Sequence, residues 1–214
     1  MPDIRKILIA DDHSIVSRGL HYLITLNFPN SQISEVGSLT DLLKKLPTDE
    51  FSHLILDLNL DDGNSIDILP EIIENYPDLL ILIHTMASEE VFGKKLMQYN
   101  VSGFLSKKST EAEVLNALKV FLQGGIYISK KLRRSFDHRE KEGDSKNAFN
   151  ELSINELKVL SLILKGSRMK EIAGDLNVTQ QTIATYKTRI FKKLGTSNIF
   201  EIQKMAELHN INFS

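Results

Sequence analysis

Short apolar runs alternate with amphipathic helical patterns through the first 125 residues of the chain. The apolar runs lie at residues 4–10, 33–37, 53–57, 79–85 and 103–106, and the helical patterns lie at residues 14–26, 39–46, 65–75, 89–99 and 110–122. Five strand–helix units in this order predict a parallel five-stranded sheet with helices on both faces and right-handed crossovers. The third and fourth runs lack polar alternation, which indicates central strands that are buried on both faces.

A second pattern, made of helices alone, begins after residue 150. The spacing of Ser153 and Glu156 predicts a capping box, and Leu152 and Leu157 are placed to form a hydrophobic staple around it. This helix should end near residue 166, and further helices are predicted at residues 169–176, 179–194 and about 197–209. We therefore expect a small all-α domain of four helices.

The segment between the two patterns differs from both in composition. Residues 129–150 hold 11 charged side chains and few apolar ones, which is typical of a linker. We therefore predict an α/β domain at residues 1–128, a charged linker at 129–150 and a helical domain at 151–214.

The two halves of the chain carry opposite net charges. Residues 1–128 hold 10 Lys and Arg against 18 Asp and Glu, a net charge of −8, whereas residues 129–214 hold 16 against 10, a net charge of +6. The basic half indicates a polyanionic partner, although a solvated basic surface explains the charge equally well. The chain has no cysteine, and no apolar run approaches the ~18–20 residues of a membrane span, so we expect a soluble, cytoplasmic protein without a membrane partner.

Polar residues follow the predicted strands in a consistent arrangement. Asp11 and Asp12 come after the first strand, Asp57 after the third, Thr85 ends the fourth and Lys107 follows the fifth. The carboxyl ends of parallel strands meet at one sheet edge, so the carboxylates should converge there and repel one another unless a cation neutralises them. Carboxylate, carbonyl and water ligands suit Mg²⁺, and the whole set suits phosphoryl transfer to an outward carboxylate.

The same polar residues are also compatible with different roles. Each one taken alone is more often a solvated strand end than a functional group. A phosphohydrolase of the haloacid-dehalogenase type would need a second Asp two residues after Asp57, where this chain has Asn59. A scaffold of the same fold that is never phosphorylated is a further alternative.

The arrangement resembles the receiver domain of two-component response regulators over about residues 4–123. The resemblance implies a flavodoxin-like (βα)5 fold with strand order 2-1-3-4-5, a non-enzymatic regulator and Asp57 as acceptor of a phosphoryl group from a histidine kinase. It assigns Mg²⁺ binding to Asp11, Asp12, Asp57 and the backbone carbonyl of Asn59, and the phosphoryl-dependent switch to Thr85, Phe104 and Lys107. One position departs from the family pattern, since Asp61 stands where a proline is usual.

The helical half contains two helices joined by a tight turn. Ile183, Ile190 and Leu194 lie on one face of the second helix, where Ile172, Ala173, Leu176 and Val178 are expected to pack against them, and polar side chains occupy the opposite face. This pattern is typical of a helix-turn-helix whose second helix enters the DNA major groove, although a helical hairpin with a charged surface has the same pattern.

Residues 152–206 resemble a LuxR-type helix-turn-helix, as found in NarL/FixJ response regulators. The matching residues are Leu152, Ser153, Glu156, Val159, Leu160, Gly166, Lys170, Glu171, Ile172, Ala173, Leu176, Thr182, Ile183, Ile190, Lys193, Leu194 and Gly195. The candidates for contacts to double-stranded promoter DNA are Lys170, Gln181, Thr182, Thr185, Thr188, Arg189, Lys192 and Lys193. Ala184, Tyr186 and Ile199 depart from residues that are common in this family, which suggests a different target preference.

Both resemblances imply one function: phosphorylation of Asp57 controls dimerisation and DNA binding. Paired half-sites favour a homodimer on activation, and Ile199, Ile202 and Met205 of the last helix are candidate dimer contacts, or core residues. A regulator that acts through protein contacts and a small-molecule phosphatase remain the alternatives.

Overall fold

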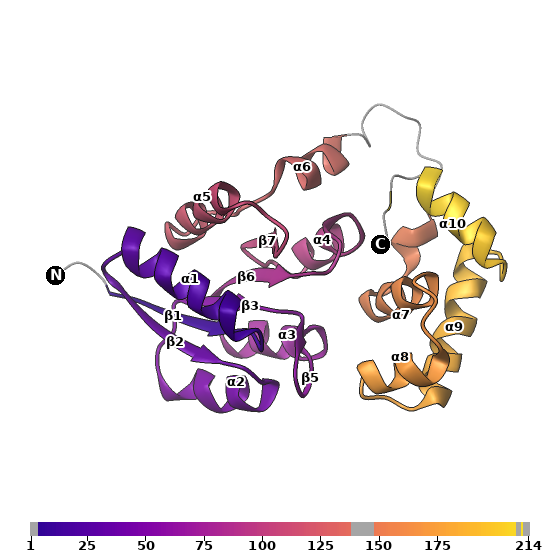
Figure 1. The fold of residues 1–214 in the computed structure, drawn as a ribbon, viewed down its shortest axis with the longest axis horizontal. Coiled ribbons are helices and arrows are strands. Elements are labelled where there is room, and N and C mark those ends of the chain that lie inside the picture. Colours follow the sequence, from indigo (N-terminus) through magenta and orange to yellow (C-terminus); the bar gives the residue numbers. More distant parts are fainter. Residues whose placement is uncertain (1–3, 138–147, 209–210, 212–214) are drawn as a thin grey trace. The chain divides into compact units, whose positions relative to one another are not determined.

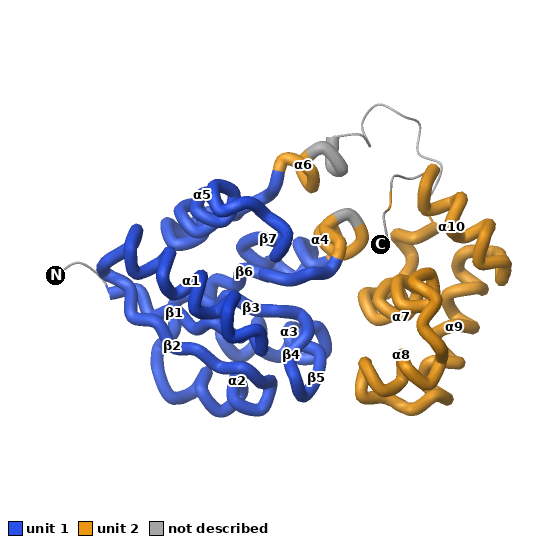
Figure 2. Tube along the Cα trace, in the orientation of Figure 1, with its two compact units in different colours: residues 1–87, 96–129 blue, residues 88–95, 130–214 orange. Residues whose placement is uncertain are grey.

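The computed structural model describes residues 4–137, 148–208 and 211. The chain divides into two compact units, Met1–Ala87 with Leu96–Ser129, and Ser88–Lys95 with Lys130–Ser214 (Figure 2). Among the described residues, no helix combines the length and apolar character that crossing a membrane requires. Each unit is described separately below.

The first unit is built on a five-stranded parallel sheet (Figure 1). Its strands are β1 (Arg5–Ala10), β2 (Ser31–Val36), β3 (His53–Leu56), β6 (Leu80–Thr85) and β7 (Gly103–Ser106), in the order β2-β1-β3-β6-β7. Counted along the sheet-forming strands this is the order 2-1-3-4-5, so the predicted flavodoxin-like topology is confirmed. The first and third strands are neighbours, with Ala10 opposite Leu56.

Helices cover both faces of this sheet. They are α1 (Ser14–Asn27), α2 (Leu39–Lys45), α3 (Ser65–Asn75) and α5 (Glu111–Leu122), with a short 3₁₀ turn η1 (Leu46–Thr48) after α2. The predicted fourth helix, α4 (Glu89–Met97), is also present, and most of its residues are counted with the second unit. One core cluster joins alternate residues of the strands to α1 and α5, for example Ile9 and Leu82 to Ile24 and Phe121. Figure 1 shows α5 on one side of the sheet and α2 and α3 on the other. Because strand side chains alternate between faces, the intervening apolar residues serve the second layer.

Besides short 3₁₀ turns, the structure contains a hairpin and a helix that the sequence did not predict. A two-stranded hairpin, β4 (Asn59–Leu60) and β5 (Gly63–Asn64), lies directly after β3. Helix α6 (Lys130–Asp137) occupies part of the predicted linker, and its residue Leu132 is only 1% exposed. Strands of two residues have no detectable period, and a single buried leucine among cations is too weak a signal to distinguish a helix from a charged linker.

The second unit contains the four predicted helices. They are α7 (Ile154–Leu164), α8 (Met169–Asp175), α9 (Gln180–Leu194) and α10 (Ile199–Leu208), preceded by the 3₁₀ turn η2 (Ala148–Glu151). The capping box of α7 and the Thr179 cap of α9 are both present, and Gly195 ends α9 with a left-handed φ of 72°. Asn177, with φ 50°, makes the turn between α8 and α9, which asparagine tolerates better than most residues.

The buried stripe of α9 forms as expected. Ile183 and Ile190 are fully buried and Leu194 nearly so, together with Ile172 and Ala173 of α8. Val178 was expected to join them, but its side chain is 37% exposed because it lies after the turn and before the first residue of α9. Ile202, one of the residues considered for a dimer contact, is fully buried and therefore belongs to the core of the unit.

Because two histidines are buried, we expect the free energy of unfolding to depend on pH. Burial lowers the pKa of His53 to about 4, and burial together with the Lys107 charge lowers the pKa of His84 to about 4. The unfolded chain takes up protons near the ordinary value of about 6.5, so acidification favours unfolding. The free energy of unfolding should therefore fall between pH 6.5 and 4, by up to about 3 kcal/mol for each residue.

A pH titration of the imidazole ¹³C–¹H signals tests this prediction. His53→Gln and His84→Gln variants assign the two resonances, and each variant should lose its share of the pH dependence of the thermal midpoint. Signals that titrate near 6.5 would contradict the prediction.

Candidate functional site

The carboxyl ends of four neighbouring strands bring the predicted site residues together. Asp11 follows β1, Asp57 follows β3, Thr85 ends β6 and Lys107 follows β7. The register places Leu56 opposite Ala10 and Thr85 opposite Ser106, so the ends are level across the sheet. The predicted convergence at one sheet edge is therefore present in the structure.

The Lys107 ammonium links two carboxylates at this edge. Its Nζ lies 2.6 Å from Oδ2 of Asp57 and 2.8 and 2.7 Å from the two oxygens of Asp11. The three side chains are only 3–4% exposed. Because separated buried charges are costly, the cation and the carboxylates stabilise one another in this arrangement.

Burial and charge together set the protonation of Asp57. Burial raises the pKa of this carboxyl group; Lys107 and a hydrogen bond with Thr85 lower it in part, and the Asp11 charge raises it further. The result is a raised pKa, which is the direction expected for a desolvated carboxylate close to a second one. A cation in the pocket would favour the ionised, nucleophilic form.

The backbone around Asp57 is fixed by short hydrogen bonds. Its N–H donates to the Ala10 carbonyl at 2.9 Å, and the Ser65 hydroxyl donates to its carbonyl at 2.6 Å. The Asn59 N–H lies 3.3 Å from Oδ1 of Asp57, so the following loop folds back towards the carboxylate. Phe104 is fully buried on β7, next to β6, the strand that carries Thr85.

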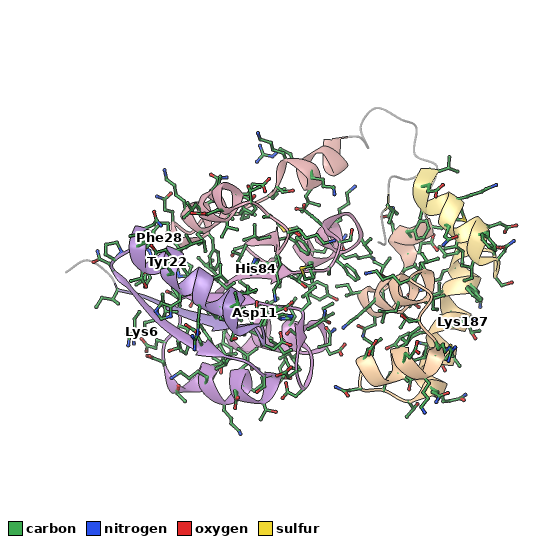
Figure 3. The ribbon with its side chains drawn as sticks, viewed as in Figure 1. Lys6, Asp11, Tyr22, Phe28, His84 and Lys187 are labelled. Atoms are coloured by element: carbon green, nitrogen blue, oxygen red, sulfur yellow. The ribbon has the colours of Figure 1, made fainter. Side chains whose placement is uncertain are left out.

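Sequence reasoning missed one residue of this cluster. His13 offers a ring nitrogen that, with carboxylate oxygens of Asp11, Asp12 and Asp57, forms a group whose ligand atoms all lie within 4.8 Å of one another. Figure 3 labels Asp11 within this unit. His13 directly follows Asp11 and Asp12 in the sequence, and this adjacency is the signal that could have predicted its place in the cluster.

The acidic loop after Asp57 has a structural role. Asp62 accepts hydrogen bonds from the N–H groups of Leu39 and Thr40, at 2.5 and 2.9 Å, and from the Thr40 hydroxyl at 2.6 Å. These contacts tie the loop to the first turn of α2. They provide a different restraint from the proline that is usual at the position of Asp61, whose side chain is exposed.

In the second unit, α9 presents a polar face. Gln181, Thr185, Thr188, Arg189 and Lys192 are exposed, opposite the buried stripe, while Thr182 is half-buried near the cap. Lys170 of α8 is also exposed. The Lys187 ammonium, labelled in Figure 3, lies 5.4 Å from the centre of the Phe191 ring, within the range of a cation–π contact.

The threonine hydroxyls of this face already have partners in the helix. Thr185 donates to the Gln181 carbonyl at 3.0 Å and Thr188 to the Ala184 carbonyl at 2.9 Å. In these rotamers each hydroxyl oxygen is available as an acceptor rather than as a donor.

Lys193 has a structural contact that the sequence did not indicate. Its Nζ lies 2.6 Å from Oε2 of the buried Glu156, and the same oxygen accepts the capping hydrogen bond from the Ser153 N–H at 2.6 Å. Burial raises the pKa of Glu156, but Lys193 and Ser153 outweigh it and the net pKa is lowered. A phosphate contact by Lys193 would compete with this ion pair.

We expect Glu156→Gln to destabilise the second unit by about 1 kcal/mol, because the negative charge that attracts Lys193 is lost, while the amide oxygen can still accept hydrogen bonds from Ser153 and Lys193 at the position of Oε2. Glu171→Gln is the matched control: Glu171 caps α8 through the Arg168 N–H at 2.7 Å, at an exposed site. Thermal unfolding of the full chain followed by circular dichroism measures both. Equal midpoint shifts in the two variants would contradict the predicted role of the ion pair.

An α/β unit with a phosphoryl-acceptor pocket, joined to a helix-turn-helix, defines a phosphorylation-regulated transcription regulator. The chain belongs to the response regulator family: residues 7–119 match the family described as "Response regulator receiver domain". Residues 150–206 match the family described as "Bacterial regulatory proteins, luxR family". This domain pair is that of the NarL/FixJ type, so the resemblances stated from the sequence are confirmed.

Individual relatives match over nearly the whole chain. The oxygen regulatory protein NreC of Staphylococcus carnosus is 29% identical over 208 residues, which are 94% of this chain and 96% of NreC. The response regulator UvrY of Escherichia coli is 25% identical over 207 residues, covering 96% and 95%. A structure of RcsB from Salmonella enterica serovar Typhimurium, bound to promoter rprA with the phosphomimetic BeF3−, superimposes with a TM-score of 0.67, 25% identity and coverage of 92% and 95%.

Proposed function

We propose that Asp57 accepts a phosphoryl group from a histidine kinase and that phosphorylation promotes dimerisation and binding of the second unit to promoter DNA. Residues 1–128 would act as the receiver, 129–150 as the linker and 151–214 as the DNA-binding domain. The relatives that support this proposal include RcsB, of which dimers bound to DNA are known. Promoter DNA as partner implies action in the cytoplasm.

The observation that carries the proposal is the placement of Asp57 between Lys107 and Asp11 at the sheet edge. A carboxylate oxygen of Asp57 would form a bond to phosphorus while the N–P bond of the phosphohistidine breaks and its electron pair returns to the imidazole nitrogen. Lys107 already lies at hydrogen-bond distance from Asp57 and would neutralise the transferred oxygens. Asn59 replaces the second acid that a phosphohydrolase needs, so we propose a regulator and not an enzyme of small-molecule turnover.

The donor set of the pocket fits Mg²⁺. Asp11 is 5% exposed, and its Oδ2, although 2.7 Å from Lys107, accepts no hydrogen bond of good geometry from the described residues. Asp11, Asp12, Asp57 and the carbonyl of Asn59 would hold the ion. When bound, Mg²⁺ supplies charge that offsets the repulsion of the carboxylates and of the incoming phosphoryl oxygens.

We propose that Thr85 and Lys107 turn to the phosphoryl oxygens and that Phe104 repacks with Thr85. Thr85 ends β6 and Lys107 follows β7, while Phe104 lies inside β7, two residues before its end. Thr85 and Phe104 are fully buried on neighbouring strands, so repacking of one would require adjustment around the other. Phosphorylation adds charge and acceptor oxygens and would bias a two-state equilibrium of the later helices.

We propose that α9 enters the major groove. Gln181, Thr185 and Thr188 would contact base edges; Lys170, Thr182, Arg189, Lys192 and Lys193 would contact the backbone. The exposed polar face of α9 opposite its buried stripe supports this assignment.

The test is the DNA affinity of the full chain with and without acetyl phosphate and Mg²⁺, with oligomeric state measured by light scattering. We expect phosphorylation to raise the affinity for promoter fragments at least tenfold and to shift monomer towards dimer. Equal affinity and mass in both conditions would refute phosphorylation control.

A further inference from the structure

We propose that His13 is a nitrogen ligand of the acidic pocket and directs it towards borderline cations such as Zn²⁺ and Co²⁺ in addition to Mg²⁺. The inference rests on the proposed function, because it concerns the same pocket. It adds a residue to the cation site and a metal preference that the four oxygen ligands alone do not provide.

The first observation is the position of the His13 ring beside the carboxylates of the pocket. Its Nδ1 lies 2.6 Å from Oδ1 of Asp12 and 3.3 Å from Oδ1 of Asp11, and 3.4 Å from the Lys107 ammonium. The His13 N–H donates to Oδ1 of Asp11 at 2.9 Å, which holds the backbone of this residue against the pocket. The ring therefore faces the carboxylates on which a cation would bind.

The outer side of the ring is open to solvent. The His13 side chain is 60% exposed, and the residue precedes the first residue of α1 without a side-chain hydrogen bond to that helix. By contrast, Asp11 and Asp57 are almost fully buried and fixed by Lys107. A cation would thus meet two buried carboxylates, the half-buried Asp12 and one exposed imidazole.

The oxygens of the pocket provide the second, independent observation. Oδ2 of Asp11 and Oδ1 of Asp12 are buried atoms that accept no hydrogen bond of good geometry within the described part of the chain. Lys107 and His13 lie at ion-pair distance from them, at 2.7 and 2.6 Å. A carboxylate oxygen has more than one lone pair, so each of these desolvated oxygens can bind a cation beside its charged neighbour.

The chemistry of the donor set gives the selectivity. Carboxylate and water ligands suit Mg²⁺, whereas an imidazole suits zinc, nickel and related ions. In a tetrahedral zinc site with bonds of about 2.0–2.2 Å, the ligand atoms lie about 3.3–3.6 Å apart. The ligand atoms of this group lie within 4.8 Å of one another, so the widest pair would have to approach by up to about 1.5 Å, by rotation of the exposed His13 ring towards the carboxylates.

The test compares cation affinities of the full chain for Zn²⁺, Co²⁺ and Mg²⁺, measured by competition with a chromophoric chelator. Wild type is compared with His13→Gln and with the control His21→Gln, which removes a different partly exposed histidine, paired with Glu35. We expect the ratio of Zn²⁺ to Mg²⁺ affinity to fall by roughly 10–100-fold in His13→Gln and not in His21→Gln. An unchanged ratio, or an equal fall in both variants, would overturn the inference.

A second measurement needs no substitution. Titration of wild type with Co²⁺ should shift the ring signals of His13 paramagnetically at the first equivalent, and Mg²⁺ should compete for the site. Shifts confined to other histidines would overturn the inference. A failure of this inference can be told apart from a failure of the proposed function. The proposed function fails only if wild type, incubated with Mg²⁺ and acetyl phosphate, forms no adduct on Asp57.

Discussion

Replacing Asp57 by Asn is expected to abolish phosphorylation of the protein by acetyl phosphate. The amide is isosteric with the carboxylate but is a far poorer nucleophile, and Lys107 would lose one of its two ion pairs. Intact mass after incubation with acetyl phosphate and Mg²⁺ should show one phosphoryl adduct in wild type and none in the variant. The increase in DNA affinity on phosphorylation should disappear with it.

Asp61→Asn is the matched control for this experiment. Asp61 lies in the same loop, is exposed and has no place in the strand-end cluster, so its variant should form the adduct at the wild-type level. An equal adduct in wild type and Asp57→Asn would place the acceptor elsewhere. No adduct in either would mean that the pocket is not the input of the regulator.

The second large effect is expected from the double variant Arg189→Ala with Lys192→Ala. Both side chains are exposed on α9, close to the proposed base-reading residues. A lost charged phosphate contact costs about 1.5 kcal/mol, so the pair should weaken DNA binding by roughly 100-fold at low salt. Each lost contact should also reduce the slope of log affinity against log salt by about 0.9.

The control removes two positive charges from the other unit, Lys44→Ala with Lys119→Ala. Both side chains are exposed on the receiver and leave α9 unchanged, so the salt slope should stay at the wild-type value. Fluorescence anisotropy with a promoter fragment at several salt concentrations measures both double variants. Equal slopes for the two would show that the charge of the whole protein, and not α9, drives binding.

Many features of this protein follow from local sequence. The apolar runs specify the five sheet strands, because strands buried on both faces need uninterrupted aliphatic side chains. Asp11, Asp57, Thr85 and Lys107 were each placed by a strand end, and parallel topology then brings strand ends to one edge. The helices of the second unit were also predicted correctly, because capping residues such as Ser153 act within one helical turn.

Contacts between residues distant in the chain, and turns with no period, decided the remaining features. The ion pair of Lys193 with Glu156 joins residues 37 apart, and neither partner shows it in its local pattern. Val178 fits the apolar stripe in sequence, but the turn at Asn177 directs it to solvent. The link of Asp62 to α2 likewise requires the turn between β4 and β5 to meet the first turn of that helix.

Periodicity and capping thus determined which segments form elements and where their polar ends lie, because these properties depend on neighbours within a few residues. Only the tertiary structure determined which polar ends touch: that Lys107 lies between Asp57 and Asp11, and that His13 turns towards the same pocket. Side-chain distances of a few ångströms depend on the packing of the whole sheet, which no local pattern encodes.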